Sequence, residues 1–198
     1  MTGVVLAGGR NSRMGRDKAS LPWQGSDFLQ VILHKLIEVC DELIVVTNTS
    51  RTEILPNVRY VADIIPQCGP LSGIHAGLVH ATSNLVFVTA CDMPYLSSAA
   101  VDHLRSLSPG WDVVAPGEAD FLEPLFACYR KTCIPVIESL LQQDIRKTQA
   151  LFRLVRYRQV PLVELTQFDP QLRFLHNINS PADYQAALRE VNSPATVL

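Results

Sequence analysis

The stretch that decides the fold lies at residues 4–18 and reads VVLAGGRNSRMGRDK. Its first part, 4–7, is a short apolar run of the kind that forms a buried strand. Gly8, Gly9 and Gly15 follow, and residues without a Cβ let a tight loop turn its backbone N–H groups toward one point. The same loop also carries basic side chains, at Arg10, Arg13, Arg16 and Lys18. A strand that runs into a glycine-rich, basic loop predicts a binding site for a phosphate-rich anion.

This loop departs from the two common phosphate-binding patterns. A P-loop requires lysine directly after its second glycine, whereas Gly15 is followed by Arg16 and Asp17. The dinucleotide pattern G-x-G-x-x-G also fails, because the glycines stand at 8, 9 and 15. The loop therefore argues against a P-loop NTPase and against a dinucleotide dehydrogenase. A plain strand-to-helix turn with solvated arginines is the alternative, and the concentration of positive charge disfavours it.

Strand-like and helix-like segments alternate along the chain. The expected strands are 3–7, 43–47, 58–62, 85–90, 113–116, 125–129 and 157–163. The expected helices are 28–39, 71–81, 98–107, 134–143 and 182–191. This alternation predicts a three-layer α/β fold, a mostly parallel twisted sheet with helices on both faces. At 198 residues, we expect one domain over 1–198, with 192–198 as a loose tail.

Polar residues follow several of the expected strands. In an open α/β sheet, ligands bind beyond the carboxyl ends of the strands. Asn48, Asp63 and Asp92 each come at or just after such an end, as does the basic loop. Asp92 is the candidate metal ligand, because Mg²⁺ needs few protein ligands when phosphate oxygens and waters complete its shell. A turn-forming role is the alternative for both aspartates.

Five blocks, in this order along the chain, together resemble the molybdenum cofactor guanylyltransferases, within the wider sugar-nucleotide type of nucleotidyltransferase. The blocks are LAGGRNSRMGRDKASL at 6–21, GPLSGIHAGL at 69–78, ACDMPYL at 90–96, EPLFACYR at 123–130 and NINSPADY at 177–184. The first and third blocks indicate the superfamily, and the last indicates the molybdopterin branch. The resemblance spans nearly the whole chain.

This resemblance implies a Rossmann-like nucleotidyltransferase fold and a Mg²⁺-dependent reaction. GMP would pass from GTP to the terminal phosphate of molybdopterin or Mo-molybdopterin, with release of pyrophosphate. Lys18, Arg13 and Asp92 would be catalytic, and Asp92 would hold the metal. The nucleotide-binding residues would be Leu6, Ala7, Gly8, Gly9, Lys18, Asn48, Asp63, Gly73 and Asp92. Asn177 and Asn179 would bind the acceptor, with both amides on one face if the segment is extended.

One loop and one single residue depart from the family pattern. The usual G-x-P-L-[LI] loop after Trp23 is replaced by GSDFL at 25–29, and Glu123 stands where Gln or His often precedes Pro-Leu. Both lie on the expected acceptor side, so the acceptor is less closely defined than nucleotidyl transfer. The alternatives are a cytidylyltransferase for the same cofactor, or another nucleotidyltransferase acting on a phosphate or sugar phosphate. A non-catalytic nucleotide sensor or cofactor chaperone is disfavoured by the presence of Asp92 and Lys18.

Composition limits the partners. The net charge is −2 and the pI about 6.2, so no overall basic field attracts nucleic acid or a membrane. No signal-peptide pattern opens the chain, and we expect a cytoplasmic protein. Molybdoenzyme apoproteins or other cofactor-biosynthesis proteins stay open as partners. The second basic stretch, 146–158, is either a solvated face or a contact for the acceptor phosphate.

Overall fold

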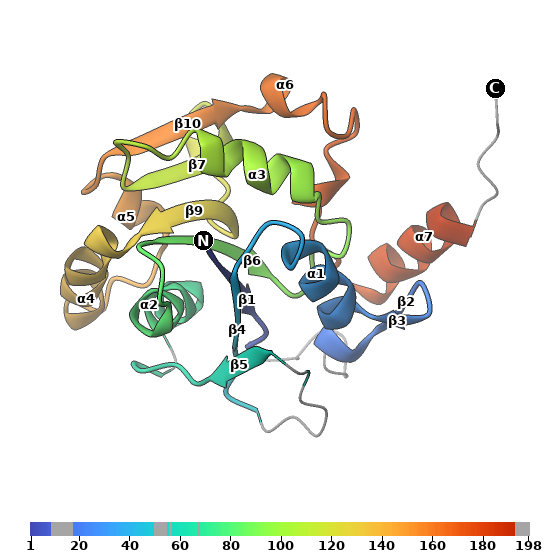
Figure 1. Cartoon of the computed structure of the whole chain (residues 1–198), viewed down its shortest axis with the longest axis horizontal. Helices are drawn as coiled ribbons and strands as arrows, with labels where there is room; N and C mark the ends of the chain where they lie inside the picture. Colours follow the sequence, from blue (N-terminus) through green and yellow to red (C-terminus); the bar gives the residue numbers. More distant parts are fainter. Residues whose placement is uncertain (9–17, 50–54, 56, 67, 193–198) are drawn as a thin grey trace.

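Figure 1 shows the computed structural model of the chain, which describes residues 1–8, 18–49, 55, 57–66 and 68–192. A central sheet crosses the molecule, and helices cover both of its faces (Figure 1). The predicted three-layer α/β architecture is confirmed. Among the described residues, no helix is long and apolar enough to cross a membrane.

The central sheet has the strand order β10-β7-β9-β6-β1-β4-β5, with β8 paired to β7. The strands are β1 (Thr2–Leu6), β4 (Glu42–Val46), β5 (Val58–Val61), β6 (Leu85–Ala90), β7 (Val113–Glu118), β8 (Phe121–Leu122), β9 (Phe126–Arg130) and β10 (Tyr157–Pro161). Four neighbouring pairs are parallel: β1 with β4, β1 with β6, β4 with β5 and β10 with β7. By contrast, β9 runs antiparallel to both β6 and β7.

The inner strands end level with one another at one edge of the sheet. Leu6 of β1 stands opposite Val46 of β4 and Ala90 of β6. Backbone hydrogen bonds carry this alignment one residue further, from Ala7 N to Val46 O at 2.9 Å and from Cys91 N to Leu6 O at 3.0 Å. The loops after β1, β4 and β6 therefore leave the sheet side by side, as the strand-end rule predicts.

Two hydrophobic cores separate the sheet from its helices. The helices are α1 (Phe28–Leu36) and α3 (Ser98–Ser106) on one face, and α2 (Pro70–His80), α4 (Ile134–Gln142) and α5 (Gln149–Phe152) on the other. Helix α2 lies very close to β1, because a Cβ at Gly77 would stand 2.8 Å from Val4 Cγ1. The short 3-10 helices are η1 (Lys18–Ser20), η2 (Lys131–Cys133) and η3 (Arg173–Leu175).

A third, smaller core lies beside α1. It is formed by Leu21, Trp23, Phe28, Ile178 and Ala187, and we call it the C-terminal cluster. It joins the hairpin of β2 (Pro22–Trp23) and β3 (Ser26–Asp27) to helix α7 (Pro181–Asn192), which lie next to each other in Figure 1. Asn192 thus belongs to α7 and not to the predicted tail, whose remainder, 193–198, lies outside the described residues.

The sequence predicts too long a strand at 157–163. Strand β10 ends at Pro161, and helix α6 (Leu162–Leu165) follows directly. Proline has no N–H to give to a ladder, so the hydrogen-bonded part of this edge strand ends at Pro161. Val163 is 75% exposed, so its apolar side chain adds nothing to the core that would hold it in a strand.

Candidate active site

Three segments that are distant in sequence meet at Lys18. Its Nζ lies 2.9 Å from Asp92 Oδ2 and 2.7 Å from Asn179 Oδ1. The side chains of Lys18 and Asp92 are only 21% and 17% exposed, so solvent screens their ion pair weakly. The structure therefore brings together a residue predicted for the nucleotide, the predicted metal ligand and a residue predicted for the acceptor.

Asp92 owes its position to the end of β6. The strand carries it to the carboxyl edge of the sheet, and a turn with Met93 N donating to Ala90 O leads the chain away. The carbonyl of Asp92 accepts the N–H of Ile178 at 2.8 Å. This bond holds the segment with both predicted acceptor residues against the end of β6.

The N-terminal turn of α7 fixes Asn179 from the other side. Asp183 Oδ2 accepts the backbone N–H groups of Asn179 at 3.0 Å and of Ser180 at 2.8 Å, while Asp183 N donates to Ser180 Oγ. This is reciprocal helix capping. The Ser180 hydroxyl, together with these N–H groups, holds the pKa of Asp183 below its usual range.

The two predicted acceptor residues differ in their surroundings. Ile178 between them is buried in the C-terminal cluster. Asn179 reaches Lys18, whereas Asn177 Oδ1 is buried and has no hydrogen-bond partner among the described residues. The acceptor role of both stays a prediction.

A second polar group lies where β4 and β5 end. Asn48 Nδ2 donates to Asp63 Oδ2 at 2.7 Å, and Asp63 N donates to Asn48 Oδ1 at 3.0 Å. A Cβ at Gly8 would stand 4.0 Å from Asn48 Nδ2, which places the start of the basic loop beside this pair. The sequence predicts Asn48 and Asp63 as nucleotide-binding residues, and the structure links them directly.

The other predicted nucleotide-binding residues are placed differently. Leu6 and Ala7 are buried, with only 8% of each residue exposed. Gly73 is buried in α2, where a Cβ would stand 3.0 Å from Leu6 Cδ2. Packing of α2 on β1 thus accounts for this glycine, and its contact with a nucleotide stays a prediction. Gly9 and Arg13 lie outside the described residues.

Glu123 is a charged residue that the sequence marks only as a departure from the family pattern. Its N–H donates to Pro116 O at 2.8 Å, and its Oε1 accepts the N–H of Leu125 at 3.0 Å. Burial raises the pKa of Glu123, and the negative charge of Asp92 raises it further. A second carboxyl group therefore lies within the electrostatic reach of Asp92.

Comparison with known proteins identifies the family. A family model described as MobA-like NTP transferase domain matches residues 3–160. The chain belongs to this family. As the resemblance predicts, it is an NTP transferase.

Individual members of the MobA-like family are similar over nearly their whole length. A protein of Pelotomaculum thermopropionicum, named "Probable molybdenum cofactor guanylyltransferase", is 37% identical over 183 residues, which cover 92% of this chain and 89% of that protein. A molybdenum cofactor guanylyltransferase of Desulfosudis oleivorans is 32% identical over 189 residues, 94% of each chain. The crystal structure of molybdopterin-guanine dinucleotide biosynthesis protein A from Archaeoglobus fulgidus matches with a TM-score of 0.82 and 27% identity, covering 96% of this chain and 98% of that chain.

MobA-like transferases generally use a divalent metal ion. In the described part of this chain, no three His, Cys, Asp or Glu side chains gather into a metal site. Asp92 offers a carboxylate at the strand end, beside the residues predicted to bind phosphate. One carboxylate fits a small divalent cation that takes its other ligands from phosphate and water. The donor set therefore suits a metal that binds together with a triphosphate.

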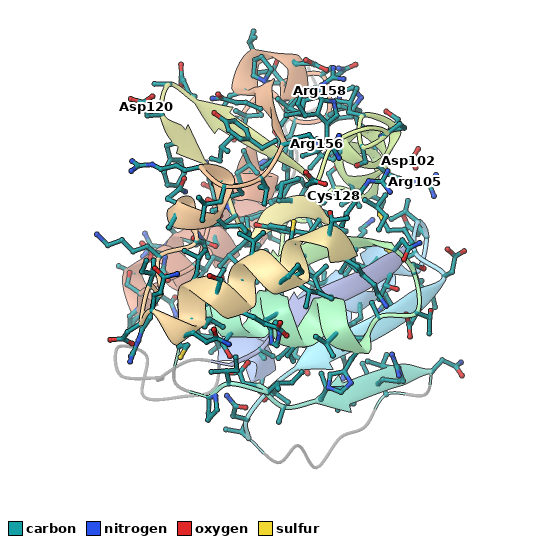
Figure 2. All side chains as sticks on the ribbon, turned by 90° about the vertical axis from the view of Figure 1, so that its left-hand side faces the viewer. Asp102, Arg105, Asp120, Cys128, Arg156 and Arg158 are labelled. Carbon is teal, nitrogen blue, oxygen red and sulfur yellow. The ribbon has the colours of Figure 1, made fainter. Side chains whose placement is uncertain are left out.

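The second basic stretch of this MobA-like chain includes a structural ion pair. Arg156 contacts Asp112, with Nε 3.0 Å from Oδ2, and Figure 2 shows it near Arg158. The Arg156 guanidinium lowers the pKa of Asp112 to about 2. Asp112 directly precedes β7, and β7 is parallel to β6 because both run antiparallel to β9. Arg156 therefore lies where β7 begins, at the other end of the strands from Asp92. Arg156 is thus a solvated structural residue, and an acceptor role for its neighbours stays a prediction.

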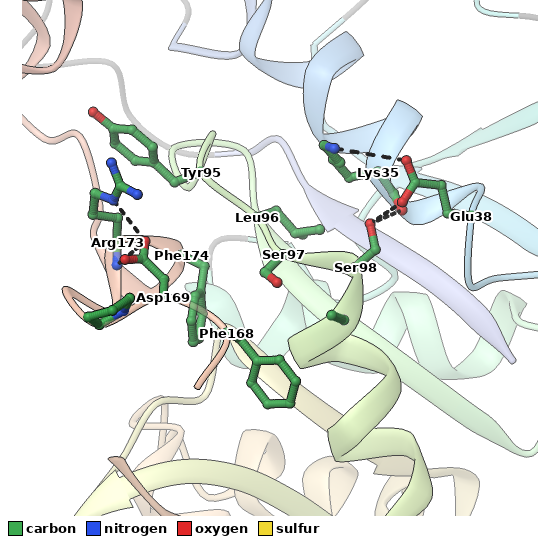
Figure 3. A pocket seen from close by; sticks show the side chains of 12 residues that line it. Lys35, Glu38, Tyr95, Leu96, Ser97, Ser98, Phe168, Asp169, Arg173 and Phe174 are labelled. Carbon is green, nitrogen blue, oxygen red and sulfur yellow. Dashed lines mark hydrogen bonds and ion pairs between the residues drawn. The ribbon is translucent and has the colours of Figure 1, made fainter. Parts of the chain in front are cut away.

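A hollow of about 480 Å³ lies between α1, the start of α3 and the segment 168–174 (Figure 3). Arg173 in its wall pairs with Asp169 at 2.7 Å and lies over the ring of Tyr95. Lys35 likewise stands 3.9 Å from Glu38. None of the predicted site residues lines this hollow. Since both cations face a carboxylate of their own, the hollow has no excess positive charge for a phosphate.

Proposed function

We propose that this chain transfers GMP from GTP to the terminal phosphate of molybdopterin, or of its molybdenum-bound form, and releases pyrophosphate. The observation that carries the proposal is the contact of Lys18 with both Asp92 and Asn179. It joins the expected donor and acceptor sides at one ammonium group. The names of the relatives support the two substrates, and the cytoplasm is the compartment that we expect for the reaction.

This reaction depends on neutralisation of negative charge more than on proton transfer. The acceptor phosphate is already an anionic nucleophile, and one of its oxygens forms a new bond to the α-phosphorus of GTP. The bond from that phosphorus to the bridging oxygen breaks, and pyrophosphate leaves with the electron pair. No Ser, Cys or His has to be activated. In-line positioning and stabilisation of the developing charge are the remaining tasks.

The residues of this chain divide those tasks. Lys18 neutralises charge that grows on the α-phosphate oxygens, and the backbone amides of residues 7–9 with Arg13 hold the triphosphate. Asp92 would hold Mg²⁺, which when bound supplies Lewis-acid neutralisation of phosphate oxygens. Asn177 and Asn179 orient the acceptor phosphate or the group that carries it.

The pair of Asn48 and Asp63 supports a guanosine substrate. The two side chains hold each other at 2.7 Å, so the Asp63 carboxylate presents acceptor oxygens in a fixed place. Guanine offers two N–H groups on its Watson–Crick edge, from N1 and from N2, whereas cytosine offers only its N4 amino group there. A base bound beside this pair would find an acceptor that suits guanine better than cytosine.

A panel of GTP, CTP, ATP and UTP tests this function. Each nucleotide is incubated with the purified protein, Mg²⁺ and molybdopterin, and pyrophosphate release is measured with and without the acceptor. Release with GTP that depends on molybdopterin supports the proposal. A preference for CTP would make the chain a cytidylyltransferase instead. Binding of GTP without any acceptor-dependent release would support the non-catalytic alternative.

A further inference from the structure

The ammonium group of Lys18 is engaged by residues of the site itself. One partner is the carboxylate that is proposed to hold the metal, and the other is the amide oxygen of Asn179. Both members of the ion pair are mostly buried, at 21% and 17% exposure of their side chains. Lys18 therefore occupies one oxygen, Oδ2, of the carboxylate that would hold a divalent cation.

An ammonium ion and a divalent cation compete for such an oxygen. They repel each other at a shared ligand, and in a partly buried site this repulsion is stronger than in water. A triphosphate changes the balance, because its oxygens accept the ammonium in place of Asp92 and Asn179 while also ligating the metal. The partners of Lys18 and the occupancy of Asp92 must therefore change together.

We propose that Lys18 closes the divalent-cation site of the nucleotide-free protein, and that the cation enters only with the triphosphate, when Lys18 moves from Asp92 and Asn179 to phosphate. This inference rests on the proposed function, since it concerns the same donor site. The metal and the nucleotide then bind together, and the metal alone binds weakly.

The exchange also reaches the acceptor side. Asn179 Oδ1 gives up the Lys18 contact in that step, while its backbone N–H stays on Asp183 at 3.0 Å. Only the side chain of Asn179 has to turn, because the capped start of α7 keeps its backbone in place. The amide that is expected to bind the acceptor thus becomes available after the donor is loaded, so donor binding precedes acceptor binding.

Binding of Mn²⁺ alone tests the competition without any turnover. Free Mn²⁺ is counted by electron paramagnetic resonance in titrations of the wild-type protein, Lys18→Met and Lys18→Gln. Removing the competing ammonium should tighten Mn²⁺ binding by about tenfold. Lys35→Met is the matched control, because Lys35 lies 3.9 Å from Glu38 in an exposed pair away from the site. It changes the net charge equally and should leave Mn²⁺ binding as in the wild type.

Two further measurements complete the test. In Lys18→Met with Asp92→Asn, the gain should vanish, which assigns the bound ion to Asp92. With a non-hydrolysable GTP analogue present, wild type should bind Mn²⁺ much more tightly than without it, and Lys18→Met should no longer surpass it. Equal or weaker Mn²⁺ binding by both Lys18 variants without nucleotide would overturn the inference. If the analogue fails to bind while the gain persists, the donor proposal fails and the competition at Asp92 stands.

Discussion

The two groups of polar residues at the carboxyl edge of the sheet are held in different ways. Asn48 and Asp63 follow β4 and β5, which are strands of the main sheet. Lys18 and Asn179 stand instead beside segments that form the C-terminal cluster, which includes Leu21 and Ile178. We call the first pair the strand-end side and the second the cluster side. Asp92 stands two residues after the end of β6, a strand of the main sheet, and contacts Lys18 of the cluster side.

The two sides differ in the size of the packed core that stabilises them. The strand ends are held firmly, because helices cover both faces of the sheet to which they belong. The cluster side depends on a small core and on single contacts, such as the hydrogen bond from Tyr184 Oη to Pro22 O at 2.6 Å. Local opening requires little free energy where few apolar groups are buried. We therefore expect the side chains of Lys18 and Asn179 on the cluster side to change partners during the reaction, while the strand-end side stays fixed.

The largest effect is expected at the residue that joins the two sides. Asp92→Ala removes the proposed metal ligand and the partner of Lys18, so turnover should fall on the order of a hundredfold or more. The thermal unfolding midpoint should change little, because Asp92 stands at a strand end and not in a core. Steady-state kinetics with calorimetric unfolding check this, and Asp120→Ala, an exposed acidic position, is the control. Near-normal turnover of folded Asp92→Ala would remove this residue from the metal site.

Replacement of Lys18 separates binding from chemistry on the cluster side. Lys18→Ala should lower kcat by between about tenfold and a hundredfold, and weaken GTP binding less, if the ammonium acts on charge that grows in the transition state. Lys18→Arg should restore part of the rate, since a planar guanidinium replaces a compact point charge. Equal losses of GTP affinity and kcat, or no loss of either, would contradict this role.

Opposite phenotypes for the two sides are the next expectation. The double variant Asn177→Ala with Asn179→Ala should keep GTP affinity and lower transfer to molybdopterin by about fivefold to tenfold. Asn48→Ala should instead weaken GTP binding, because Asp63 loses the partner that orients it. Calorimetry with GTP and a transfer assay measure both quantities. Loss of GTP affinity in the double variant, with its fold unchanged, would move the acceptor site toward Glu123.

The strand-end side is also the part that sequence reasoning predicts best. Asp63 and Asp92 directly follow apolar strand patterns, and parallel strands bring their carboxyl ends together. The prediction for Gly73 shows the limit of such reasoning. A glycine in a loop-to-helix segment suggests close approach of a ligand, yet here the space is filled by Leu6. A glycine in the sequence shows that one residue has no side chain, but it does not show whether a ligand or another residue occupies that space.

On the cluster side, the basic loop itself points to Lys18, whereas only the family resemblance points to Asn179. Residues 161 positions apart form the contact of Lys18 with Asn179, and no local periodicity encodes it. The hairpin of β2 and β3 has two residues in each strand, too few for an alternation to be detected. The apolar residues of β9 likewise do not show that it runs antiparallel to its neighbours. The direction of a strand depends on the connections that precede and follow it.

The smallest effect is expected where α7 holds the backbone of Asn179. The pKa of Asp183 is lowered in the folded protein from 3.8, so its capping bonds are fully present above that pH. They are lost as the pH falls through the lowered value, when the carboxylate takes up a proton. The backbone amide signals of Asn179 and Ser180 in nuclear magnetic resonance spectra should therefore titrate below pH 3.8.

The variant Asp183→Asn tests this explanation, because it keeps an acceptor oxygen but cannot titrate. The two amide signals should lose their pH dependence. Transfer at neutral pH should stay closer to wild type than in the asparagine double variant. If Asp183→Asn impaired transfer as strongly as that double variant, the charge of Asp183, and not its geometry, would govern the cluster side.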